Sequence, residues 1–157
     1  MKIQLLVIGK TSQGFVERGL AEYAGRLKHY LPFEMQVIPD IKNAKNLSFE
    51  QIKEKEGENL LKLLQPTDYV ALLDEHGMEF TSMQFAAYIE KKKQTTIKHL
   101  VFVIGGPYGF SQKIYNRAQE KIALSKMTFS HQLIRLVFAE QLYRAMTILC
   151  GEPYHHE

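Results

Sequence analysis

Three short segments of the chain combine residue types that suit ligand binding, and each begins at the end of an apolar run. They are residues 72–77 (LLDEHG), 104–109 (IGGPYG) and 124–129 (LSKMTF). Ligands of open parallel sheets bind beyond the carboxyl ends of the strands, so these segments are candidates for one binding site. Gly105 and Gly106 have no Cβ and would let a ligand approach the backbone, although an ordinary strand-to-helix turn uses the same residues.

The sequence lacks the motifs of several other kinds of site. The glycine turn is neither G-x-G-x-x-G nor a Walker loop, so no fingerprint for nicotinamide or ATP is present. A serine hydrolase would need a G-x-S-x-G elbow, which does not occur. A metal site is not expected, because Cys150 is the single cysteine, His155 and His156 are adjacent, and the other histidines are scattered.

The segment 131–149 has the spacing of a long helix with charged residues set among apolar ones. Glu140 and Arg144 are four residues apart and can form a favourable pair. Arg135 and Arg144 are also suited to contact phosphate or carboxylate groups. A helix with one wet face accounts for the same pattern, and the sequence leaves both interpretations open.

The elements that must position these residues alternate between strand and helix. Apolar or alternating runs predict five strands, and helical spacing with capping signals at Ser48 and Thr81 predicts the helices between them. The expected strands are 2–9, 33–38, 68–74, 99–104 and 121–124, and the expected helices are 13–30, 48–64, 81–93, a short one from Ser111, and 131–149. Such alternation predicts an α/β fold with a mostly parallel sheet and helices on both faces, in one domain over residues 1–157.

Size, cysteine content and charge narrow the class of protein further. A chain of 157 residues can bury a core without disulfides or metals, and one cysteine fits a cytoplasmic protein. No run approaches the ~20 apolar residues of a membrane span. The net charge is −3 over residues 1–90 and +6 over residues 91–157. The second part is therefore the better candidate for contact with a polyanion, although a solvated charge distribution explains the numbers equally well.

Taken together and in order, these motifs closely resemble the RlmH family along the whole chain. The resemblance rests on residues 105–109 and 124–129, on His131, Arg135, Glu140, Gln141, Tyr143, Arg144 and Ala145, and on Pro153, Tyr154 and His155; Gly9-Lys10 and Lys55-Glu56-Gly57 agree too. It implies a SPOUT-class methyltransferase that uses S-adenosylmethionine (SAM), methylates N3 of a pseudouridine in 23S (large-subunit) ribosomal RNA, and works as a homodimer. It also implies a trefoil knot in the C-terminal part, which general topology rules would not predict.

The resemblance also implies roles for individual residues. SAM would contact Leu73, Gly105 and the segment Leu124, Ser125, Lys126, Met127, Thr128 and Phe129. Catalysis would involve Arg144 and the tail, where Tyr154 could stack on the target base and His155 could act as the base, because an imidazole titrates near neutral pH. RNA contacts would involve His131, Arg135 and His156. The family usually has Arg or Lys where this chain has His156, so a fixed positive charge is missing there.

Two other functions stay open at the level of sequence. The chain could be a non-catalytic ribosome- or RNA-binding module that kept the fold, or a SAM methyltransferase that acts on another RNA. With a net charge of only +3, we expect weak, salt-sensitive binding of naked RNA and a folded ribosomal particle as the better substrate. Chain ends are often mobile, so a passive tail is the alternative to a catalytic His155.

Overall fold

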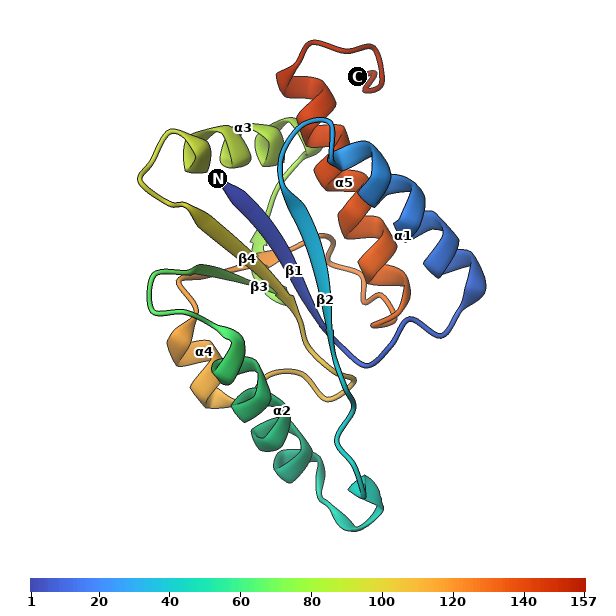
Figure 1. Ribbon diagram of the computed structural model, residues 1–157, viewed down its shortest axis with the longest axis vertical. Helices are drawn as coiled ribbons and strands as arrows, with labels where there is room; N and C mark the ends of the chain where they lie inside the picture. Colours follow the sequence, from blue (N-terminus) through green and yellow to red (C-terminus); the bar gives the residue numbers. More distant parts are fainter.

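A computed structural model describes all residues from 1 to 157 and shows a five-stranded sheet with helices on both faces (Figure 1). The strands are β1 (Lys2–Ile8), β2 (Phe33–Ile38), β3 (Tyr69–Glu79), β4 (His99–Ile104) and β5 (Glu120–Ala123). Their order across the sheet is β2-β1-β4-β3-β5, and every neighbouring pair is parallel. The predicted α/β class and parallel sheet are confirmed.

The helices are α1 (Gly14–Leu27), α2 (Phe49–Leu63), α3 (Ser82–Lys93), α4 (Gln112–Arg117) and α5 (Leu133–Leu149), with one turn of 3₁₀ helix at Ala44–Asn46. Ser48 and Thr81 both form complete capping boxes, at the starts of α2 and α3. Each cap accepts a hydrogen bond from a backbone N–H that would otherwise lack a partner, which explains why these two boundaries could be predicted from sequence.

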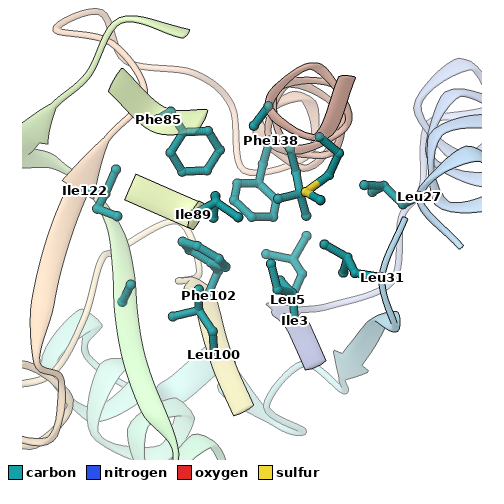
Figure 2. Packing of buried hydrophobic residues seen from close by; sticks show 14 of the residues in the cluster. Ile3, Leu5, Leu27, Leu31, Phe85, Ile89, Leu100, Phe102, Ile122 and Phe138 are labelled. Carbon is teal, nitrogen blue, oxygen red and sulfur yellow. The ribbon is translucent and has the colours of Figure 1, made fainter. Parts of the chain in front are cut away.

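The central strands are mostly apolar because both of their faces are covered. In β1, Ile3 and Leu5 point to the core shared with α1, α3 and α5, whereas Leu6 and Ile8 point to the core shared with α2 and α4. Figure 2 shows the larger core, where the rings of Phe85, Phe102 and Phe138 meet from α3, β4 and α5. The Phe102 and Phe138 ring centroids are 4.7 Å apart.

Strand β3 extends past its predicted end at residue 74. Leu73 pairs with Ile122 of β5, and the register then shifts so that Met78 pairs with the same residue. Residues 74–77 therefore bulge out of the sheet between two paired stretches. Gly77 closes the bulge, because any side chain there would overlap the backbone of Lys121 and Ile122. None of the helices combines the length and apolar character that crossing a bilayer requires.

Candidate cofactor-binding site

The carboxyl ends of β3, β4 and β5 surround a cavity of about 550 Å³. Its walls come from the three segments singled out in the sequence, together with residues around the start of α5. The lining residues are Leu73 to His76, Ile104 to Phe110, Tyr115, Ile122, Leu124, Ser125, Met127 to His131, and Ile134. The three segments were predicted to follow carboxyl ends of parallel strands, and they meet at one cavity because β4, β3 and β5 are neighbours in the sheet.

The glycine turn forms one wall of this cavity with exposed backbone. The Gly109 N–H donates to the Gly106 carbonyl at 3.1 Å, and Gly109 has φ of 87°, which a residue with a side chain rarely adopts. Gly105 packs against the ring of Phe110, where a Cβ would lie 3.1 Å from the nearest ring carbon. The turn is thus tight and leaves main-chain groups within reach of a ligand.

The cavity lining that follows β3 carries two carboxylates that accept hydrogen bonds from hydroxyl groups. The Tyr115 hydroxyl donates to Asp74 Oδ2 at 2.5 Å, and the Thr128 hydroxyl donates to Glu75 Oε2 at 2.6 Å. Burial, together with the bond to Asp74, raises the pKa of Tyr115 to about 12, so this hydroxyl keeps its proton at physiological pH. The wall therefore presents fixed negative charge, which suits a cationic ligand.

Most residues expected to contact SAM line the cavity. Leu73, Gly105 and five residues of the segment 124–129 do so, and the Met127 N–H donates to Ser125 Oγ at 2.9 Å. Lys126 is the exception, because its side chain is 87% exposed and its Nζ lies 3.9 Å from Glu79 Oε1, outside the cavity. Sequence reasoning pointed to the segment 72–77 but assigned only Leu73. Tyr115 carried no signal, since only the packing of α4 brings it to Asp74.

Arg135 does not have the role predicted for it. The side chain is fully buried, and its guanidinium donates to the carbonyls of Ile8, Gly9 and His131 and to the hydroxyl of Thr11, at 2.7 to 3.1 Å. Burial lowers its pKa. The expected contact with RNA is wrong, because the side chain is fully buried and its guanidinium is bonded to the end of β1, to the β1–α1 connection and to the His131 carbonyl.

The tail packs against α5 and α1 in an arrangement that we call the tail cluster. Its members are Tyr23, Glu140, Tyr143, Arg144, Tyr154 and His155. Tyr154 donates to Glu140 Oε1 at 3.1 Å, and its ring lies under the Arg144 guanidinium at 4.7 Å. The predicted pair of Glu140 and Arg144 is confirmed at 2.5 Å.

His155 lies in this cluster with one ring nitrogen engaged and one free. Its Nδ1 is 3.3 Å from Arg144 Nη1, whereas its buried Nε2 has no hydrogen-bond partner and lies 3.8 Å from a Glu157 oxygen. His156 is exposed, while His131 lines the cavity. Burial and the contacts with Tyr23 and Glu140 raise the pKa of Tyr154, so its phenol stays protonated.

The tail follows the C-terminal end of α5 (Figure 1), whereas the cavity is lined by residues at the start of this helix. Ile134, which lines the cavity, and Arg144, which the tail contacts, are ten residues apart, or about 15 Å along a helix axis. Reacting groups must approach to about 3–3.5 Å. Within one chain, therefore, the residues expected to act on the target base do not face the cavity.

Comparison with known proteins agrees with this architecture. A family described as predicted SPOUT methyltransferase matches residues 1–155. Proteins named ribosomal RNA large subunit methyltransferase H are similar over the full length of both chains. They include those of Parabacteroides distasonis, 68% identical, Phocaeicola vulgatus, 62% identical, and Flavobacterium johnsoniae, 54% identical.

SPOUT methyltransferases use SAM, and the cavity fits such a ligand. Its volume lies in the range of about 300–1,000 Å³ typical of small-molecule sites. Apolar residues such as Leu73, Ile104 and Leu124 suit an adenine ring, the glycine turn offers main-chain groups, and the carboxylates suit a sulfonium cation. The fold, the cavity and the comparisons agree, and the chain belongs to the SPOUT methyltransferase family.

Proposed function

We propose that this chain transfers the methyl group of SAM to N3 of a pseudouridine in large-subunit ribosomal RNA. The observation that carries the proposal is the cavity at the carboxyl ends of β3, β4 and β5. It occurs in a chain 68% identical over its full length to a protein named ribosomal RNA large subunit methyltransferase H. A non-catalytic module would have no need to keep this cavity.

Methyl transfer requires mainly that the two reactants are held in position and that water is excluded. SAM supplies a methyl group on a cationic sulfur, and the attacking imide nitrogen is anionic once its proton has left. Charge is therefore lost in the transition state, so aligning the two reactants contributes more than stabilising new charge. The glycine turn and the segment 124–129 would hold SAM, and Asp74 and Glu75 would complement its positive charge.

The proton on the imide nitrogen needs an acceptor, and the tail cluster contains the candidates. His155 would take the proton, Tyr154 would stack on the base, and Arg144 would orient the tail through its contacts with both residues. These groups lie about 15 Å along α5 from the cavity of their own chain. The tail of a second copy would resolve the separation, so we propose a symmetric homodimer in which each cavity is completed by the partner.

The partly exposed apolar residues of α5 agree with such an assembly. Ile134, Leu136, Val137 and Tyr143 are only half-buried in the single chain. A further part of the proposal is that the C-terminal part of the chain forms a trefoil knot. Its support is that β5 pairs on both sides of residues 74–77 and that Thr128, beyond β5, bonds to Glu75. We also propose that residues 1–157 act as one domain.

The substrate would be RNA within a ribosomal particle rather than free RNA. The charge of +6 over residues 91–157 is modest for a nucleic-acid-binding protein, so shape must supply the rest of the affinity. His131 in the cavity wall and His156 on the tail are the remaining candidates for RNA contact. A ribosomal substrate would place the protein in the cytoplasm.

The test is methyl transfer to ribosomes. The protein is incubated with labelled SAM and large subunits, or assembled ribosomes, from a strain that lacks the modification, and the labelled nucleotide is mapped. We expect one labelled pseudouridine in large-subunit RNA, and none with the Gly105→Val variant. Label on a different RNA would favour the alternative substrate, and bound SAM without any transfer would favour the non-catalytic alternative.

A further inference from the structure

A buried carboxyl group lies behind the glycine turn, on the side away from the cavity. Glu56 of α2 is only 6% exposed, in a second, small hollow. Gly105, Gly106 and Gly109 border both the hollow and the cavity, so the turn is a thin wall between them. Anything that moves Glu56 acts on the same backbone that would hold SAM.

Two glycines allow this close approach of α2. A Cβ at Gly106 would lie 2.9 Å from Glu56 Oε1 and closer still to Oε2. A Cβ at Gly57 would lie 3.3 Å from the Cβ of Ser111 and closer still to its hydroxyl. Neither glycine needs left-handed backbone, so space alone explains the missing side chains. The helix, the turn and the start of α4 are packed around one carboxyl group.

This carboxyl group has no hydrogen-bond partner to stabilise a charge. Glu56 Oε1 and Ser111 Oγ are both buried and unpartnered, and the hollow has no room for a water molecule. Two charged groups lie nearby: the Asp40 carboxylate beyond β2 repels a second negative charge, and Lys53 on α2 pairs with Glu50 at 2.6 Å. The glycine turn and Ser111 bring no charge. Burial, reinforced by Asp40, raises the pKa of Glu56 to about 7.

We propose that Glu56 is a positioning residue for SAM, which holds the glycine turn in place as a neutral acid and releases it on ionisation. An ionised carboxylate must be hydrated or paired. Here the hollow has no room for water and Lys53 is already paired with Glu50, so ionisation favours movement of the turn away from Glu56. A displaced turn no longer forms the wall of the cavity. SAM affinity should therefore fall as pH rises through neutrality. The inference rests on the proposed contact between SAM and Gly105.

The first experiment compares SAM binding by calorimetry from pH 6.0 to 8.5 in the wild type and in Glu56→Gln. The amino group of SAM titrates in the same range, so the readout is the ratio of the two dissociation constants. We expect a ratio near 1 at pH 6.0 that grows to about tenfold weaker binding by the wild type at pH 8.5. Glu58→Gln, an exposed neighbour on α2, is the matched control and should follow the wild type. A ratio that stays constant with pH overturns the proposal.

The second experiment tests the packing between Glu56 and the turn. Gly106→Ala should weaken SAM binding by about tenfold, because its Cβ collides with the carboxyl group. Adding Glu56→Ala removes that group, so the double variant should bind SAM at least about threefold better than Gly106→Ala alone. A double variant that is no better than the single variant contradicts the proposed contact.

An NMR titration without SAM tests the role of Glu56 independently of the proposed SAM site. The backbone amides of Gly105, Gly106 and Gly109 should shift in NMR spectra with a midpoint near pH 7 in the wild type, and not in Glu56→Gln. A wild type that binds no SAM at any pH refutes the cofactor site, while the amide titration still reports on Glu56. Amides that do not titrate refute the role of Glu56 even if SAM binds.

Discussion

The cavity and the tail cluster are built in opposite ways. Three strand ends and main-chain groups form the cavity, which keeps space for a ligand. In the tail cluster, polar side chains of α1, α5 and the tail bond to one another, and the buried Nε2 of His155 is left without a partner. We therefore expect the contacts to the methyl donor itself to come from one chain. The groups expected to act on the acceptor lie elsewhere on the same chain, and in the proposed dimer a second copy would bring them to the cavity.

The two arginines of α5 offer the sharpest contrast between these regions. Arg135→Ala would leave three carbonyls of the β1–α1 and α5 connections without their buried partner, at a cost of about 3–5 kcal/mol in the free energy of unfolding. Arg144→Ala, in the partly exposed tail cluster, should cost less than about 1 kcal/mol yet reduce methylation. Urea unfolding and methylation assays of both variants check this. Equal loss of stability in both variants would contradict it.

In the cavity, Gly105→Val should have the next largest effect. The branched side chain would meet the Phe110 ring and fill space beside the turn, so SAM affinity should fall at least about thirtyfold, or ~2 kcal/mol. Calorimetry measures the affinity. Gly25→Val on α1, where a Cβ meets nothing within 4 Å, is the control and should bind SAM normally. Unchanged binding by Gly105→Val would refute the placement of SAM.

Deleting residues 154–157 should affect the tail cluster alone. Methylation should fall at least about tenfold, which corresponds to ~1.4 kcal/mol of transition-state stabilisation, while SAM affinity stays within about twofold of the wild type. If His155 is the base, His155→Ala should reduce the rate more at pH 6.5 than at pH 9, where hydroxide can replace it. A truncated protein that methylates ribosomes at the wild-type rate would show that the tail is inert.

For Glu56 we predict a smaller effect, on the pH dependence of the free energy of unfolding. Its pKa is raised from 4.5 to about 7, so the folded protein binds more protons than the unfolded chain between these values. The wild type should therefore lose stability as pH rises from about 4.5 to 7, by roughly 1–3 kcal/mol, with little further change from Glu56 above pH 7. Urea unfolding of Glu56→Gln should show a flatter profile over this window. A parallel profile in wild type and variant would contradict the assignment.

The last prediction concerns the oligomeric state of the protein. If the tail of one copy completes the cavity of another, light scattering at micromolar concentration should give about twice the mass of 18.2 kDa. Mixing the tail-deleted protein with Gly105→Val should restore some methylation, because one intact cavity can meet one intact tail. A fully active monomer would refute the dimer.

The sequence by itself determined the elements and the edge of the sheet where the cavity lies. Strands 33–38 and 99–104 were predicted to the residue, because continuous or alternating apolar runs ended by Pro39 and Gly105 are local signals. The capping boxes at Ser48 and Thr81 are equally local. In a parallel sheet the carboxyl ends of the strands meet at one edge, so the motifs that follow the strands predicted the edge where the cavity lies, while the structure showed that β4, β3 and β5 are neighbours.

Only the tertiary structure decided what individual polar residues do. Arg135 and Arg144 look alike in the sequence, yet one is buried against the β1–α1 connection and the other supports the tail. Tyr115 carried no signal of its own, and Glu56 belonged to the family resemblance without any role, because both roles come from the packing of α4 and α2 against strand ends far away in sequence. The burial of a side chain and its hydrogen-bond partners determine its charge state and the groups that it can contact. Both depend on tertiary contacts that a local sequence pattern does not contain.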